Sequence, residues 1–278
     1  AGLILIIYVA HFLDKKKFKY IKLKSSFFSL WIPIFLIISL ILPSNFSTAA
    51  LMFLIIIILL FIGGYPVKRI ISMLILAFTF LIFFVLTSKA YPELIPNRVD
   101  TWISRIESFK NGHDLESNYQ IEKAKTAIAS GGVLGLGAGK SVMKNFLPQS
   151  SSDFIYAIII EEFGLIGGLG IIILYLLLLF RIVVIAHKSK KFFGKLIVIG
   201  LGIPVVIQAF VNIGVALQIL PVTGQNLPLI SSGGTAAWIT CISFGIILSV
   251  SSCRDEIHDD LVDNKENNNP IAILSETA

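Results

Sequence analysis

The chain has 278 residues, of which 55% are hydrophobic and only 14% are charged, with a mean hydropathy of +0.86. This composition excludes an ordinary soluble domain and predicts an all-α polytopic membrane protein. The net charge of +6 does not indicate nucleic acid as a partner, because the lysines bracket apolar runs as topology signals do. The two cysteines and four histidines lack the spacing of a disulfide framework, a metal site or a catalytic triad.

Seven apolar segments follow one another along the chain. The opening run, AGLILIIYVAHFL, is too short to cross a bilayer, so we expect it to be the end of a helix that begins upstream. Six further runs approach or reach the roughly 20 residues that a spanning helix needs. They cover residues 26–43, 46–64, 70–86, 154–185, 196–220 and 230–252. We therefore expect about seven transmembrane segments.

Basic residues occur in alternate connections between these segments. Connections 15–24, 66–69 and 187–195 are rich in lysine and arginine, whereas 43–48 and 220–234 contain none. Basic loops remain in the cytoplasm, so residues 87–153 form one large loop on the outer side. We expect residues 1–253 to form the transmembrane domain. The polar tail 254–278 is predicted to be disordered and cytoplasmic.

The outer loop is too long for a simple connector, and such loops are usually functional. Its segment NYQIEKAKTAIASGG predicts an amphipathic helix near the membrane surface, ending at Gly131. The apolar face of this helix would carry Ile121, Ala124, Ala127 and Ile128. The glycines of GGVLGLGAGKS give the backbone freedom to approach a ligand closely. The stretch is no nucleotide-binding P-loop, because that motif requires glycine at Leu134.

Three acidic residues lie where the loop re-enters the membrane. From the residues alone, Asp153 is equally well explained as a helix-terminal residue stabilised by the helix dipole and as a catalytic carboxylate. Glu161 and Glu162 follow within the apolar run, so at least one should face a cavity or a polar partner. A buried structural role, bonded to a neighbouring helix, is the better explanation for them than direct chemistry.

Basic and amide side chains offer candidates for binding an anionic substrate. Arg98, Arg105, Lys140 and Lys144 suit a phosphate, although pairing with nearby acids or lipid headgroups explains them better on their own. Gln208 and Asn212 interrupt the apolar run 196–220, which indicates either a cavity-lining helix or polar helix packing.

Two stretches together resemble one known family. IASGGVLGLGAGKSVMKNFLPQSSSDFIYAIIIEEFGLIGG and VNIGVALQILPVTGQNLPLISSGG are similar to the signature of the shape, elongation, division and sporulation family (FtsW, RodA and SpoVE), and most similar to its cell-division branch. The resemblance extends over essentially the whole chain. It implies a fold of ten transmembrane helices, of which this chain would include the end of helix four to helix ten.

The resemblance also implies a reaction. Family members polymerise lipid II into glycan strands at the outer face of the cytoplasmic membrane, and Asp153 in LPQSSSDF matches their essential loop aspartate. An α-linked pyrophosphate donor and a β-linked product require one inverting displacement, for which Asp153 would be the general base. Positive charge or a divalent cation (Mg or Mn) would stabilise the leaving pyrophosphate. Gln149, Ser151, Thr223 and Asn45 depart from residues usual in the family.

Substrate-binding candidates and partners complete the expectation. The candidates are Arg98, Arg105, Gln120, Lys140, Ser141, Lys144, Glu161, Glu162, Asn212, Thr223, Ser231 and Ser232. The implied partners are lipid II, a class B penicillin-binding transpeptidase, other division proteins and membrane lipid, and the implied location is the inner membrane at the division septum. Three alternatives remain: an elongation polymerase like RodA, a lipid II flippase, and a membrane scaffold that recruits division proteins.

Overall fold

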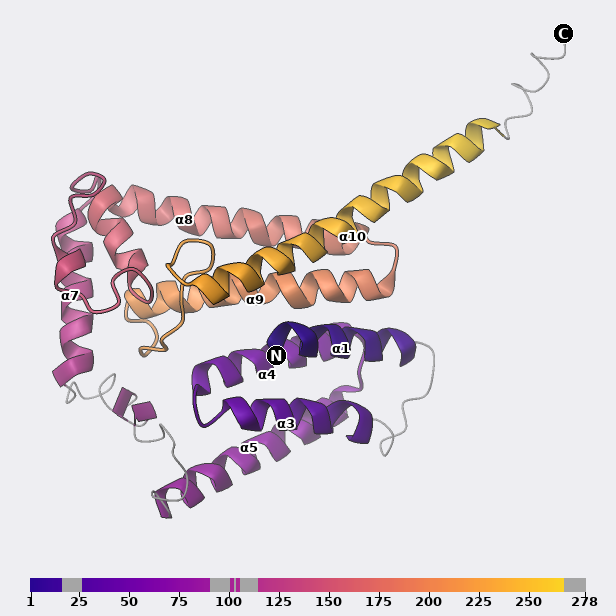
Figure 1. Cartoon of the computed structure of the whole chain (residues 1–278), viewed down its shortest axis with the longest axis horizontal. Helices are drawn as coiled ribbons and strands as arrows, with labels where there is room; N and C mark the ends of the chain where they lie inside the picture. The colour runs from indigo at the N-terminus through magenta and orange to yellow at the C-terminus, as the bar shows by residue number, and fades with distance from the viewer. Residues whose placement is uncertain (17–26, 91–100, 103, 106–114, 268–278) are drawn as a thin grey trace, which may run out of the picture.

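A computed structural model describes residues 1–16, 27–90, 101–102, 104–105 and 115–267. Within these ranges the regular elements are helices (Figure 1). In chain order they are α1 (Gly2–Lys16), the π-helical turn η1 (Phe27–Trp31), α3 (Ile32–Ile41), α4 (Phe46–Ile62), α5 (Val67–Ala90), α7 (Leu115–Gly131), the 3-10 turn η2 (Met143–Asn145), α8 (Ile155–Lys188), α9 (Phe192–Ala216) and α10 (Gly234–Asn267).

Four helical stretches are long and apolar enough to cross a membrane. They are Val67–Ser88, Ile155–Lys188, Phe192–Ala216 and Gly234–Ser252. Two further stretches, Phe27–Ile41 and Phe46–Ile62, are apolar but shorter. The all-α, polytopic character predicted from the sequence is confirmed. The number of seven spans remains a prediction, because α1, α3 and α4 are each shorter than a full crossing.

Helix α9 is the centre of the assembly. Of its most apolar stretch, 67% is buried, against 11% to 22% for the other three candidate spans. Helices α1 and α4 contact it on one side, and α8 and α10 contact it as well (Figure 1). A Cβ on Gly200 would lie 2.6 Å from Ile6 of α1, and one on Gly202 would lie 2.7 Å from Ile182 of α8. These glycines therefore allow close helix approach, as small residues do in membranes.

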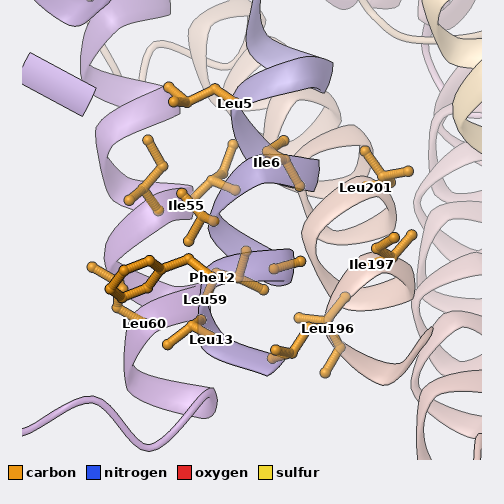
Figure 2. Close-up of a cluster of buried hydrophobic side chains, with 14 of the residues drawn as sticks. Leu5, Ile6, Phe12, Leu13, Ile55, Leu59, Leu60, Leu196, Ile197 and Leu201 are labelled. Carbon is orange, nitrogen blue, oxygen red and sulfur yellow. The ribbon is translucent and has the colours of Figure 1, made fainter. Parts of the chain in front are cut away.

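Apolar side chains from α1, α4 and α9 form the main core. Figure 2 shows Leu5 of α1 on the side of Ile55 and Leu59 of α4, whereas Ile6 lies on the opposite side of α1, toward α9 and its Leu201. Most of this cluster is almost fully buried; Leu59, for example, has 0% of its surface exposed. Buried Trp31 extends the cluster to η1 and donates a hydrogen bond from Nε1 to the hydroxyl of Tyr65 at 3.2 Å. This core stabilises the bundle.

Helix α7 lies across the ends of α8 and α9 that are opposite the basic connection 187–195 (Figure 1). It ends at Gly131, as predicted, and Ala124 and Ala127 are buried. These alanines contact Phe154 and Ala157 at the start of α8 and Val215 of α9. The apolar face expected at the membrane surface thus packs largely against protein.

Helix α8 is not the single continuous helix that the sequence predicted for residues 154–185. Gly164 has φ 71° and ψ −173°, a conformation outside the helical region, and it divides α8 into a short leg, 155–163, and a long helix from 165. Glycine reaches this conformation without the steric cost that a side chain would add. The short leg 155–163, which includes Glu161, is therefore separated by this break from the long part of α8.

Helix α10 continues past the expected start of the polar tail at residue 254. It ends at Asn267 and extends away from the other helices (Figure 1). No glycine or proline lies between residues 246 and 269, so helix propagation meets no strong breaker until Pro270. The disorder expected for the tail 254–278 stays a prediction, and residues 268–278 lie outside the described ranges.

Candidate active site

Asp153 lies in a tight turn immediately before α8. The carbonyl of Gln149 accepts hydrogen bonds from the backbone N–H groups of Ser152, Asp153 and Phe154 at 3.0, 3.1 and 3.4 Å. Gln149 itself has φ 55°, a left-handed conformation that costs a non-glycine residue on the order of 1 kcal/mol. Phe154 is the N-cap of α8, and no side chain caps that helix end. The Asp153 carboxylate therefore does not serve as a helix cap.

The connection between α9 and α10, residues 217–233, is bonded to this turn. Ser231 Oγ donates to the Ser152 carbonyl at 2.6 Å and accepts the Leu227 N–H at 2.8 Å. Ser232 donates from both its N–H and its Oγ to the Ser151 carbonyl, each at 3.0 Å. Both serines were predicted to bind substrate, and the structure shows that their hydroxyl groups join the two loops.

Asn212 of α9 is hydrogen-bonded both to the Asp153 turn and to the 217–233 connection. Its Nδ2 donates to the carbonyl of Asp153 at 2.8 Å and to the carbonyl of Gln225 at 2.7 Å. The side chain is 1% exposed, and its Oδ1 has no hydrogen-bond partner among the described residues. Because both bonds go to carbonyl oxygens, the donor must be the amide nitrogen. Asn212 therefore makes a positioning contact at the Asp153 turn, and its predicted binding of substrate stays a prediction.

Further amide contacts connect the 217–233 loop to the helices. Gln225 Nε2 donates to Thr48 Oγ1 at 3.1 Å, and Thr48 lies in the first turn of α4, where its N–H donates to the N-cap Asn45. Gln208 Nε2 of α9 donates to the Asn226 carbonyl at 3.1 Å. The loop that contacts Asp153 is therefore fixed to both α4 and α9.

Arg105 approaches Asp153 across Gly224. A Cβ on Gly224 would lie 3.6 Å from Asp153 Oδ2 and 4.0 Å from Arg105 Nη1, so both charged groups border the same glycine. Arg105 Nη1 also donates to the Val222 carbonyl at 3.4 Å. The nearby Trp102 packs against Phe46 of α4, with ring centroids 4.9 Å apart. This aromatic contact holds the arginine segment beside the start of α4.

The electrostatic environment of Asp153 favours proton uptake. Burial raises the pKa of the Asp153 carboxyl above its usual value of 3.8, and hydrogen bonding from Ser152 and the charge of Arg105 lower it in part. Burial is the largest of the three effects. A carboxylate with a raised pKa accepts a proton more readily, which suits a general base.

Glu161 belongs to a separate polar contact, distinct from the Asp153 turn. It is 1% exposed and accepts hydrogen bonds from the hydroxyl of Ser141 and from the N–H groups of Val142 and Met143, the latter two at 3.1 and 3.2 Å. The carboxylate thus fixes residues 141–143, which lead into η2. The structure thus shows a buried, bonded carboxylate whose partners lie in the 141–143 stretch, where the sequence had suggested a neighbouring helix. Substrate binding by Glu161 or Ser141 stays a prediction.

The remaining candidates lie on other surfaces. Lys140 and Lys144 are exposed, while Gln120 of α7 and Glu162 are half-buried, and no described contact joins any of these four to Asp153. Arg98 lies outside the described residues. Substrate binding by these residues stays a prediction.

Glycines in the 131–139 stretch make protein contacts. A Cβ on Gly135 would lie 2.3 Å from the carbonyl oxygen of Glu162, and one on Gly164 would lie 2.1 Å from that of Val133. Backbone hydrogen bonds join the two segments, including Leu136 N–H to the Glu161 carbonyl at 2.9 Å. Gly135 therefore serves close backbone packing against the break in α8, where the sequence had suggested close approach to a ligand.

Sequence reasoning did not single out Gln225, Thr48 or the N-cap role of Asn45. The only signal was their position beside the resemblance motifs, since amides and hydroxyls in an apolar chain need partners.

Thr223 Oγ1 is buried and has no hydrogen-bond partner among the described residues. No cluster of three or more His, Cys, Asp or Glu side chains in the described ranges could hold a metal ion.

Comparison with known proteins identifies the family. The model of the cell cycle protein family FtsW/RodA/SpoVE matches residues 1–256. The chain belongs to this family. It is accordingly an integral membrane protein, in agreement with its four candidate spans.

Several curated relatives carry names from the same family. The "Probable peptidoglycan glycosyltransferase FtsW" of Xanthomonas oryzae pv. oryzae is 37% identical over 216 residues, covering 76% of this chain and 43% of the relative. The protein of the same name from Geobacter metallireducens is 34% identical, with 91% of this chain and 65% of the relative covered. Stage V sporulation protein E of Bacillus subtilis is 39% identical over 54% of this chain and 42% of its own. The chain therefore spans less than two thirds of these relatives.

Two solved structures show the same fold. One was described in work on the coordination of polymerization and crosslinking by a peptidoglycan synthase complex; it matches with a TM-score of 0.67 and 23% identity over 91% of this chain and 69% of its own. The other is the rod shape determining protein RodA of Thermus thermophilus, with a TM-score of 0.59 and 22% identity over 91% of this chain and 64% of its own. At this identity the likeness concerns the fold.

Proposed function

We propose that the protein containing this chain is a peptidoglycan glycosyltransferase that polymerises lipid II during cell division. The observation that carries the proposal is the position of Asp153. Its carboxylate and the guanidinium of Arg105 border Gly224, at the point where the two loops of the family signature meet. The FtsW relatives at 34% and 37% identity, named as peptidoglycan glycosyltransferases, support the reaction class and favour division over elongation.

The proposed reaction is a single inverting displacement. The Asp153 carboxylate takes the proton from the acceptor sugar hydroxyl as its oxygen attacks the anomeric carbon of the donor. The bond from that carbon to the pyrophosphate oxygen breaks, and the lipid pyrophosphate leaves with the electron pair. Because the inverting route forms no enzyme-linked sugar, it needs no second carboxylate as nucleophile. This agrees with the single acidic residue, Asp153, in the 149–153 turn.

Arg105 is the proposed contact for developing negative charge. Its guanidinium donates to the Val222 carbonyl and lies beside Gly224, close to where the carboxylate acts. A guanidinium is permanently charged and offers several donors to phosphate oxygens. Lys140 and Lys144 are exposed on the neighbouring stretch and would attract the anionic substrate at longer range. A divalent cation brought with the substrate pyrophosphate stays a prediction.

The orientation and the partners are part of the proposal. We infer that the loops around Asp153 face outward, because the opposite ends of α8 and α9 carry the basic connection 187–195. By the same rule α10 ends in the cytoplasm, and residues 1–253 form the transmembrane domain. The structure described for a peptidoglycan synthase complex supports a class B penicillin-binding transpeptidase as partner, and the FtsW relatives support a role at the septum.

The experiment places the full-length protein, with its transpeptidase partner, in liposomes containing lipid II. Glycan strands and lipid II translocation are both measured. Strand formation supports the proposal. Translocation without strands would instead favour the flippase alternative, and neither product would favour a scaffold.

A further inference from the structure

Residues 133–136 form an apolar turn at one end of the long part of α8. Val133, Leu134 and Leu136 are 63%, 80% and 42% exposed. Leu134 is among the most exposed large hydrophobic residues that the structure describes. Such a cluster at a protein surface marks contact with a membrane or another protein.

Backbone hydrogen bonds fix this turn at a defined height along α8. Leu165 N–H donates to the Gly132 carbonyl at 3.0 Å, and Ile166 N–H donates to the Val133 carbonyl at 3.4 Å. On the C-terminal side of the turn, Leu136 N–H donates to the Glu161 carbonyl at 2.9 Å. The turn is therefore held at the point where the long part of α8 begins.

The length of α8 relates this height to the bilayer. From Ile166 to Ala186 the helix rises about 30 Å at 1.5 Å per residue, which equals the thickness of the hydrocarbon core. His187 and Lys188 follow directly at the other end. Arg181 is about 7.5 Å from that end, a distance that its side chain can cover to reach the headgroups. Leu165 and Ile166 consequently lie where the hydrocarbon begins on the opposite side, and the turn lies beside them.

The apolar surface of the turn continues the lipid-facing surface of α8. Leu165, Ile166 and Leu169 are 47%, 59% and 59% exposed, as expected for side chains that contact lipid. At the polar side of the turn, the Lys140 side chain passes close to Gly137, where a Cβ would lie 3.3 Å from its Cδ. An apolar tip followed by a lysine matches the boundary between acyl chains and anionic headgroups.

We propose that the 133–136 turn is a membrane anchor, which inserts Val133 and Leu134 into the bilayer surface beside α8 and places Lys140 among anionic headgroups. The anchor stabilises the break at Gly164 against the membrane surface, and through the short leg 155–163 it fixes the height of the Asp153 turn. The bound partner is the phospholipid bilayer. This inference is independent of the proposed reaction.

The test uses full-length protein with its native cysteines replaced by serine, in vesicles of phosphatidylethanolamine and phosphatidylglycerol. An environment-sensitive fluorophore is attached at Leu134→Cys, at Leu174→Cys as a deep control and at Thr126→Cys as a water control. Residue 174 is 64% exposed in the middle of α8, and residue 126 is exposed on α7. Nitroxide lipids labelled near the headgroup or near the chain end report the depth of each probe.

The anchor predicts that the Leu134 probe is quenched by the shallow nitroxide at least about twofold more than by the deep one, as for other interfacial segments. The probe at residue 174 should be quenched more by the deep nitroxide than by the shallow one. Of the three probes, only the one at residue 126 should be quenched by aqueous iodide. Lys140→Gln should remove any preference of the Leu134 signal for phosphatidylglycerol. Iodide quenching at Leu134 equal to that at residue 126 would overturn the proposal. So would protection that appears only when the transpeptidase is added, because a protein would then cover the turn.

Discussion

The helix core around α1, α4 and α9 and the loop region around Asp153 are stabilised by different interactions. The core is formed by apolar side chains such as Leu59, Ile56 and Leu196, each 0% exposed. The Asp153 region is joined mainly by hydrogen bonds from Asn212, Ser231 and Ser232 to backbone carbonyls. Apolar packing has little directional preference, whereas hydrogen bonds fix distance and angle. The core therefore determines whether the helices assemble, and the polar contacts determine where the carboxylate lies.

The largest effect is expected from Gly164→Ala. The added Cβ would lie 2.1 Å from the Val133 carbonyl oxygen, on a residue with φ 71°, so the 131–137 stretch must separate from α8. We expect a stability loss of about 3 kcal/mol or more and loss of polymerisation, measured by thermal unfolding and by strand formation. Gly170→Ala is the matched control, because nothing lies within 4 Å of its Cβ position. Equal behaviour of the two variants would contradict the packing described for Gly164.

Asn212→Leu should lower the rate while the core persists. The substitution keeps the branched shape of the side chain but removes both bonds, to the carbonyls of Asp153 and Gln225. A displacement of the carboxylate by about 1 Å can cost on the order of 100-fold in rate. We expect a loss of this size in the turnover number and a much smaller change in the Michaelis constant. An unchanged turnover number would show that Asn212 does not position Asp153.

The pH dependence should separate activity from stability at Asp153. Burial raises the pKa of this carboxyl, so the folded state binds the proton more tightly than the unfolded state does. The Asp153 carboxyl therefore lowers the stability of the folded protein near neutral pH, and this penalty is relieved as the pH falls through the raised pKa. The activity changes in the opposite sense, because a protonated carboxyl cannot act as a base. Arg105→Gln should move the acid limb of the rate profile to higher pH, because the arginine charge lowers this pKa. A shift to lower pH would contradict the assignment.

Leu59→Ala should leave the rate per folded molecule nearly unchanged. The side chain is fully buried between α1, α4 and α9, and its truncation leaves a cavity that costs about 2 kcal/mol or more. Thermal unfolding should detect this loss, and active-site titration should give wild-type turnover for the remaining folded protein. A matched loss in turnover would show that the core and the Asp153 region are not separable.

Much of the site could be predicted from the sequence because its residue types contrast with an apolar chain. Asp153, Arg105, Asn212 and the serines at 231 and 232 were all candidates, and the structure brings them together. The specific roles could not be predicted. Whether a serine hydroxyl binds substrate or a backbone carbonyl depends on the path of the other loop, which local pattern does not contain.

The fold was predicted at the level of its helices, and the errors concern where helices break or end. Glycines 164, 167, 168 and 170 look alike in the sequence, yet only Gly164 has a non-helical conformation inside α8. Its break is set by backbone bonds to residues 132 and 133, a contact between distant segments. Helix α10 continues past its apolar run for a different reason: a polar composition does not by itself stop a helix that contains no breaker.

The most direct test of Asp153 as the general base is Asp153→Asn in the full-length protein, assayed for the initial rate of glycan-strand formation from lipid II. Asparagine keeps the shape and the backbone carbonyl that Asn212 binds, so the turn should remain in place. Glu122→Gln, on the exposed face of α7, is the matched change from carboxylate to amide. If Asp153 is the general base, its variant should fall to roughly 1% of the wild-type rate or below, while the control keeps full activity. An Asp153→Asn protein that forms strands at a rate close to wild type would contradict the account.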